Sequence, residues 1–140
     1  MPSSTTSSES RSERIRVLLV DDNQAMLVRA ARVLSAACLV VGQVQDGAAA
    51  LAAAAALTPD VIVLDISMPG MSGLEVAARL RSNRSAAAIV FLTVHDDAEF
   101  VEAAQAAGAI GYVVKPRLAT DLLTAVREAR ARRPFVSALR

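Results

Sequence analysis

Short apolar segments alternate with helical patterns along most of the chain, and this alternation restricts the fold more than any other feature. Helical patterns cover Gln24–Ala37, Gly47–Leu57, Leu74–Ser82, Ala98–Ala107 and about Ala119–Arg132. Five segments before and between them have the length and β-branched composition of buried strands, namely Ile15–Val20, Leu39–Val44, Val61–Ile66, Ile89–Thr93 and Ile110–Val114. This order predicts an α/β fold in which helices cover both faces of a parallel sheet.

The composition and the two ends set the limits of this domain. Residues 1–13 are rich in serine and threonine, which predicts a disordered tail. Residues 14–133 are the predicted domain, and residues 134–140 are a predicted C-terminal tail or the remnant of a linker. A single cysteine excludes an internal disulfide, and no apolar run is long enough to span a membrane. The net charge of +1 gives no general indication of nucleic-acid binding. We therefore expect a cytoplasmic protein that binds neither nucleic acid directly nor a membrane.

Polar residues stand where four of the predicted strands end. Asp21 and Asp22 follow the first strand, and Asp65 follows the third. Thr93 ends the fourth strand, and Lys115, the only lysine of the chain, follows the fifth. Because ligands of such folds bind at the carboxyl ends of the strands, we expect these side chains to share one site.

Ordinary explanations exist for most of these residues taken singly. Asp22 could cap the following helix, Thr93 could be a β-branched strand residue, and Lys115 could be a solvated charge. Asp65 is harder to explain in this way, because an acid after four apolar residues is unfavourable unless it is paired or bound to a metal. All of these residues lie at the carboxyl ends of predicted parallel strands, and this shared position favours one common binding site.

The residue types at this edge indicate phosphoryl chemistry. Three neighbouring carboxylates repel one another, which raises their pKa values unless a cation neutralises them. Mg²⁺, or Mn²⁺, prefers such oxygen ligands and keeps open positions beside one or two carboxylates. A lysine and a hydroxyl opposite the metal would hold a phosphoryl group, and a carboxylate can act as the nucleophile that forms an aspartyl phosphate.

Four segments resemble the receiver domain of two-component response regulators, and in particular the receivers that precede a helix-turn-helix domain. The segments are VLLVDDN at 17–23, DVIVLDISMPGMSGLE at 60–75, IVFLTVHDD at 89–97 and AGAIGYVVKP at 107–116. The resemblance extends from about Arg14 to Arg132 in the right order and spacing. It implies a flavodoxin-like, doubly wound (βα)5 fold with a five-stranded parallel sheet of order 2-1-3-4-5.

The resemblance also implies a phosphorylation site with a metal. Asp65 would be the phosphoacceptor. Asp22 and Asp65 would bind Mg²⁺ directly, Asp21 would hold it through a water molecule, and the backbone carbonyl of Ser67 would complete the protein ligands.

Further residues would bind the phosphoryl group and transmit its presence. The resemblance implies that Thr93 and Lys115 contact the phosphoryl oxygens. Tyr112 would be an aromatic switch that turns inward when Thr93 moves toward the phosphate. Without the family pattern, Tyr112 would be interpreted as a half-buried strand residue with a hydrated hydroxyl.

Three residues are expected to tune the lifetime of the phosphoryl group. Ser67, two residues after the acceptor, and Val94 and His95, which follow Thr93, flank the approach of a water molecule. Val94 should narrow that approach, and neither Ser67 nor His95 carries a carboxylate or amide to hold the water. We expect slow decay. His95 could still orient a water, or it could be an ordinary exposed loop histidine.

The implied function is a signalling switch and not an enzyme with turnover. A sensor histidine kinase or a phosphotransfer protein would donate the phosphoryl group. Phosphorylation would change the surface of the fourth predicted helix, the fifth strand and the fifth helix, and would promote binding of a partner or formation of a homodimer. We expect a stand-alone receiver. The alternative is a receiver fragment of a DNA-binding transcription regulator whose output domain is absent here.

Other protein classes fit the sequence less well. A haloacid dehalogenase requires a second acid at the position of Ser67. A flavin carrier requires an uncharged phosphate-binding loop at the position of Asp21-Asp22-Asn23. A binding module of the same fold without phosphorylation would lack part of the acid, threonine and lysine set.

Overall fold

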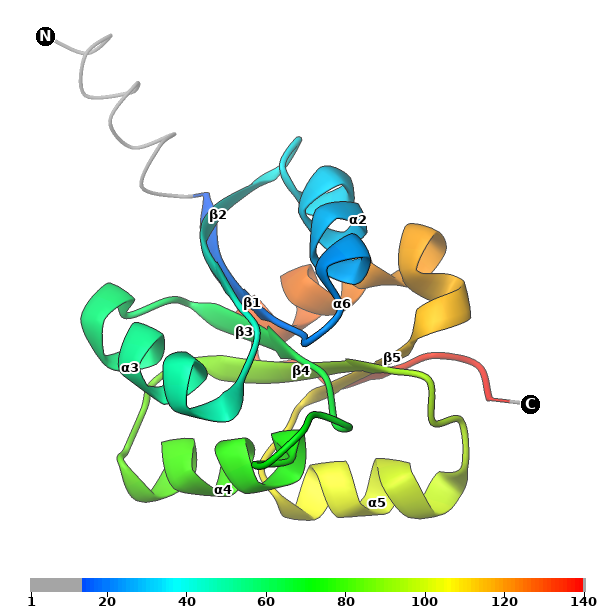
Figure 1. The fold of residues 1–140 in the computed structure, drawn as a ribbon. Helices are drawn as coiled ribbons and strands as arrows, with labels where there is room; N and C mark the ends of the chain where they lie inside the picture. The colour runs from blue at the N-terminus through cyan, green and yellow to red at the C-terminus, as the bar shows by residue number, and fades with distance from the viewer. Residues whose placement is uncertain (1–13, 140) are drawn as a thin grey trace, which may run out of the picture.

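A parallel sheet of six strands runs through the centre of the protein. The computed structural model describes residues 14–139, so the predicted tail of residues 1–13 lies outside the described residues. The strand order is β2-β1-β3-β4-β5-β6 (Figure 1). The strands are β1 (Ile15–Val20), β2 (Cys38–Val44), β3 (Val61–Leu64), β4 (Ala88–Thr93), β5 (Gly111–Val114) and β6 (Phe135–Val136). The predicted order of the first five strands, 2-1-3-4-5, is confirmed.

The sixth strand corrects the predicted number of strands. β6 lies in the predicted C-terminal tail or linker, residues 134–140, and it pairs in parallel with β5. Phe135 donates its backbone N–H to the carbonyl of Ile110 at 3.1 Å, and Ser137 donates to the carbonyl of Tyr112 at 2.8 Å. The side chain of Phe135 packs against the core. A strand of two residues has no detectable periodicity, so the sequence pattern could not reveal it.

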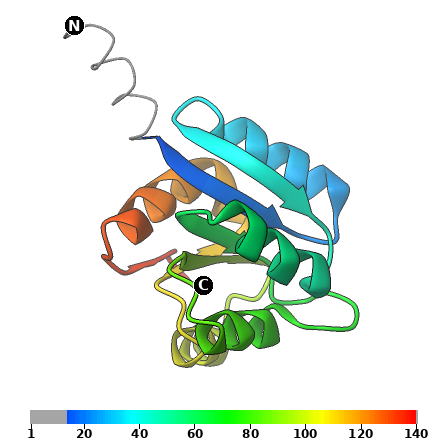
Figure 2. The ribbon, with the colours of Figure 1, turned by 90° about the vertical axis from the view of Figure 1, so that its left-hand side faces the viewer.

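Helices cover both faces of the sheet (Figures 1 and 2). One face carries α2 (Gln24–Leu34) and α6 (Leu118–Arg130), and the other carries α3 (Gly47–Leu57), α4 (Gly73–Ser82) and α5 (Ala98–Ala106). None of the helices in residues 14–139 combines the length and the apolar character that crossing a bilayer requires.

Each central strand contributes side chains to two separate cores. Towards α2 and α6 point Val17, Val63, Val90 and Val113, and towards the other three helices point Leu18, Ile62, Phe91 and Tyr112. Because both faces are covered, all four residues of β3 are buried. This double burial explains the continuous apolar run before Asp65.

Helix caps fix the loops that follow β1 and β3. The side chain of Asn23 accepts a hydrogen bond from the backbone N–H of Met26 at the start of α2. The hydroxyl of Ser72 accepts one from the backbone N–H of Glu75 at the start of α4. Such caps stabilise a helix start by about 1 kcal/mol each. The caps therefore fix where the loops after β1 and β3 end and the following helices begin.

Candidate functional site

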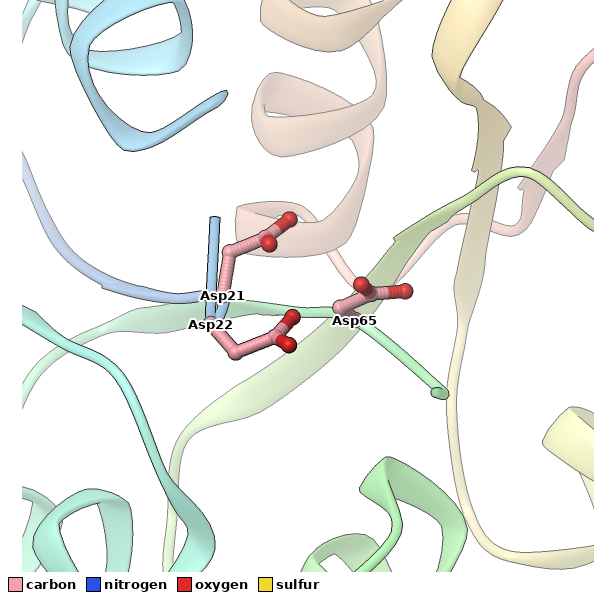
Figure 3. A group of neighbouring side chains, drawn as sticks. All are labelled: Asp21, Asp22 and Asp65. Carbon is pink, nitrogen blue, oxygen red and sulfur yellow. The ribbon is translucent and has the colours of Figure 1, made fainter. Parts of the chain in front are cut away.

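Three carboxylates converge at the carboxyl end of the sheet. Asp21 and Asp22 follow β1, Asp65 follows β3, and one oxygen from each lies within 4.8 Å of the others (Figure 3). Asp21 and Asp65 are buried, whereas Asp22 is exposed. The backbone N–H of Asp65 donates to the carbonyl of Val20 at 3.1 Å, which continues the pairing of the strands into the site. Asn23, not Asp22, caps α2, so capping does not explain Asp22.

Lys115 binds two of these acids. Its Nζ lies 3.0 Å from Oδ2 of Asp21 and 3.0 Å from Oδ2 of Asp65. Burial disfavours the charge on Lys115, but the attraction of the two carboxylates outweighs burial and raises the pKa of the lysine. Burial also raises the pKa of Asp21, an effect that the N–H of Asn23 and the lysine only partly offset. One lysine among three acids leaves the cluster with an excess of negative charge.

The cluster fits a divalent cation such as Mg²⁺ or Mn²⁺. Oδ2 of Asp21 is buried and touches Lys115, but the contact lacks hydrogen-bond geometry, and in residues 14–139 this oxygen is the buried side-chain atom without a hydrogen bond. Hard cations prefer carboxylate oxygens and neutralise their mutual repulsion. An unsatisfied buried oxygen beside two further carboxylates is therefore compatible with a metal.

Gly73 supports the site from the start of α4, and it is not among the predicted site residues. A Cβ atom at this position would lie 1.9 Å from the carbonyl oxygen of Asp65. The backbone N–H of Gly73 donates to the carbonyl of Ile66 at 2.7 Å. Only glycine permits α4 to begin directly against the backbone of the acid. Its place beside the capping residue Ser72 is the one sequence signal that marks it.

Thr93 and Tyr112 are both in the interior. Thr93 is fully buried at the end of β4. Tyr112 is 2% exposed, and its hydroxyl donates to the carbonyl of His95 at 2.7 Å. Burial, with nearby carboxylates led by Asp97, raises the pKa of Tyr112 to about 12. The interpretation as a half-buried residue with a hydrated hydroxyl is wrong. The ring of Tyr112 is buried in this structure, and the role of Thr93 and Tyr112 as a phosphorylation switch stays a prediction.

His95 bridges the two loops that border the site. Its Nε2 lies 2.7 Å from the hydroxyl oxygen of Ser67, and its ring stacks on Phe100 with centroids 3.9 Å apart. This pairing was not predicted, and the role of His95 in the lifetime of the phosphoryl group stays a prediction. Val94, in contrast, is 62% exposed.

The family of the chain follows from a comparison with known proteins. The family model of the response regulator receiver domain matches residues 17–127. The chain belongs to this family. Its fold, its acidic cluster and the contact of its only lysine with that cluster agree with the resemblance found in the sequence.

The relatives of this receiver include transcription regulators. The probable transcriptional regulatory protein NarL of Mycobacterium tuberculosis is 38% identical over 128 residues, which cover 89% of this chain and 59% of that protein. The nitrate/nitrite response regulator protein NarL of Escherichia coli is 36% identical over 124 residues, which cover 87% and 57%. The chain thus spans a little over half the length of these relatives. The predicted likeness to the helix-turn-helix effector branch is confirmed.

Solved receiver structures have the same fold. The signal receiver domain of the response regulator NarL from Mycobacterium tuberculosis superposes with a TM-score of 0.82 at 36% identity, covering 86% of this chain and 99% of that one. A LuxR-family two-component response regulator from Aurantimonas sp. SI85-9A1 gives a TM-score of 0.85 at 31% identity, covering 89% and 91%.

Among the residues singled out in the sequence, two groups form in this receiver. The first joins Asp21, Asp22 and Asp65 with Lys115. In the second, His95 contacts both Ser67 and Tyr112. Such a receiver domain is a signal-transduction module of two-component systems and not a classical enzyme.

Proposed function

We propose that Asp65 accepts a phosphoryl group from a phosphohistidine of a sensor histidine kinase or a phosphotransfer protein. One observation carries this proposal, namely the approach of the lone lysine to within 3.0 Å of two buried acids beside a third acid. A lysine in this position can shift from the carboxylates to the incoming phosphoryl oxygens. Because histidine kinases draw on ATP, the proposed reaction belongs in the cytoplasm.

The transfer is a displacement at phosphorus. A carboxylate oxygen of Asp65 attacks the phosphorus atom and forms a P–O bond. The P–N bond to the donor histidine breaks, and its electron pair stays on the imidazole nitrogen. Lys115 neutralises a phosphoryl oxygen, and the hydroxyl of Thr93 donates a hydrogen bond to another. The receiver thereby assists its own phosphorylation.

The proposed metal ligands are oxygens of the same loops. Asp22 and Asp65 would bind Mg²⁺ directly, Asp21 would hold it through water, and the carbonyl of Ser67 would add a further oxygen. When bound, the metal neutralises charge on the phosphoryl group. The buried, unsatisfied Oδ2 of Asp21 supports this arrangement.

Loss of the phosphoryl group requires attack by water on phosphorus, which releases phosphate and restores the carboxylate of Asp65. We propose that this reaction is slow. His95 Nε2 contacts Ser67 and is thus not free to orient a water in this arrangement. The Val94 side chain, next in sequence to the buried Thr93, would narrow the path of the water.

The output proposal concerns the surface of α5, β5 and α6. Movement of Thr93 toward the phosphate would alter the loop whose carbonyl, on His95, holds the hydroxyl of Tyr112. That surface would then bind a partner or a second copy of the chain. β6 pairs with the edge of β5, so a partner that binds at this edge would contact or displace β6.

A second candidate function is that of the receiver part of a DNA-binding transcription regulator. It is favoured by the relatives, which are transcriptional regulators whose aligned parts cover 59% and 57% of their length. Phosphorylation of Asp65 would then control an output domain through the same surface.

The test is Asp65→Asn, which removes the nucleophile but keeps the shape of the side chain. Purified protein is incubated with a small phosphodonor and Mg²⁺, and its intact mass is measured. Wild type and the control Asp46→Asn, where asparagine still caps α3, should each gain one phosphate. Addition of phosphate to Asp65→Asn at the wild-type level would contradict the assignment.

A further inference from the structure

A second buried polar cluster joins the C-terminal segment to the turn that carries Lys115. The buried polar and charged residues of the described chain are Asp21, Asp65, Thr93, Asp121 and Ser137. The first three belong to the proposed phosphorylation site, whereas Asp121 and Ser137 contact each other. The hydroxyl of Ser137 donates to Oδ2 of Asp121 at 2.7 Å. Arg117 donates to the same carboxylate through Nε at 2.8 Å and Nη2 at 3.3 Å.

Ser137 also holds the last residue of β5. The backbone N–H of Val114 donates to the hydroxyl oxygen of Ser137 at 3.3 Å, and this contact is buried. The backbone N–H of Ser137 donates to the carbonyl of Tyr112 at 2.8 Å. A hydroxyl offers one donor and two acceptor positions, so this side chain ties the end of β5 to the carboxylate of α6.

These contacts hold residues on both sides of Lys115 along the chain. Val114, which precedes the lysine, is held by Ser137, and Arg117, which ends the short 3₁₀ turn Lys115–Arg117, is held by Asp121. The backbone of the lysine is therefore fixed on both sides by one connected cluster. Without the Ser137 hydroxyl, Asp121 would keep Arg117 as its partner, but the buried N–H of Val114 would lose the hydroxyl oxygen to which it donates. Because an unpaired buried N–H is unfavourable, we expect this turn to shift.

We propose that Ser137 is a positioning residue for Lys115, which would extend the phosphoryl-binding site to the C-terminal strand. This inference rests on the proposed function. The residues matched by the receiver family model end at 127, so Ser137 lies beyond them. Binding of a phosphoryl group by a lysine depends on placement to within a fraction of an ångström, and such placement requires a rigid support.

The test separates binding of the phosphoryl group from binding of the metal. Mg²⁺ binds the carboxylates, whereas beryllofluoride, a mimic of the phosphoryl group, also needs Lys115. We expect Ser137→Ala and the nearly isosteric Ser137→Cys to weaken beryllofluoride binding about tenfold, with the Mg²⁺ affinity unchanged. Ser137→Thr retains a hydroxyl and should restore binding. Calorimetry gives both affinities, and fluorine NMR reports on the contact of Lys115 with the bound fluorides.

Val136→Ala is the matched control, because it shortens the exposed neighbouring side chain of β6 without removing a hydrogen bond. It should bind beryllofluoride like the wild type. Wild-type beryllofluoride affinity in Ser137→Ala and Ser137→Cys would overturn the inference, and so would a parallel loss of Mg²⁺ affinity, which indicates general damage. Absence of beryllofluoride binding by the wild type would instead contradict the proposed function.

Discussion

Replacing Lys115 with methionine should destabilise the metal-free protein far more than the loss of one ion pair on the surface. The lysine side chain is 13% exposed, and the carboxylates of Asp21 and Asp65 are each 5% exposed. Methionine keeps the apolar stem of the lysine and removes only the ammonium group. In the variant, the two buried carboxylates beside Asp22 therefore lose the cation that pairs with them.

The size of the effect follows from this burial. Removing one partner of a buried ion pair costs about 3–5 kcal/mol, because the remaining charge is uncompensated. For a domain of this length, 1 kcal/mol corresponds to about 3–5 °C in melting temperature. We expect Lys115→Met to melt roughly 10–20 °C below the wild type at neutral pH without a metal.

Mg²⁺ should restore part of the stability that the lysine provided by neutralising the carboxylates. Thermal unfolding followed by circular dichroism, with EDTA or with saturating Mg²⁺, gives the shift that the metal produces. That shift should be larger in Lys115→Met than in the wild type, because the carboxylates of the variant repel one another more strongly. It should be mostly lost in Asp22→Ala, which lacks a proposed ligand.

The control is Arg79→Met, which removes an ion pair with Glu75 whose two side chains are about half exposed. Such surface pairs contribute about 0–1 kcal/mol, so this variant should melt close to the wild type. Equal losses in Arg79→Met and Lys115→Met would refute the reasoning. So would a Mg²⁺ shift in Lys115→Met that does not exceed that of the wild type.

Two further predictions concern Tyr112 and Val94. Tyr112 is the only tyrosine of a chain without tryptophan, so its ultraviolet titration should show one ionisation, near pH 12 and not near 10. The tyrosine ionises at a lower pH in the unfolded chain than in the folded protein, so the free energy of unfolding should fall as pH rises from about 10 to about 12. Tyr112→Phe should abolish that part of the loss. Val94→Ala should shorten the lifetime of the phosphoryl group, followed by intact mass or Phos-tag gel. Decay of the wild type within seconds, or an unchanged rate in the variant, would count against the proposed role.

The sequence by itself determined the class of the fold and the edge at which the site forms. The run Val61–Leu64 is apolar throughout because helices cover both faces of β3. A parallel sheet brings the carboxyl ends of its strands to one edge, so Asp21, Asp65 and Lys115 could be assigned to one site from their positions alone.

Tertiary structure alone decided the contacts that hold these residues in place. Ser67 and His95 are 28 residues apart, and Ser137 and Asp121 are 16 apart, yet each pair forms a hydrogen bond of 2.7 Å. The burial of Tyr112 is equally a property of the packed core. Periodicity reports which face of one element is buried, whereas a hydrogen bond between distant side chains depends on how several elements pack together.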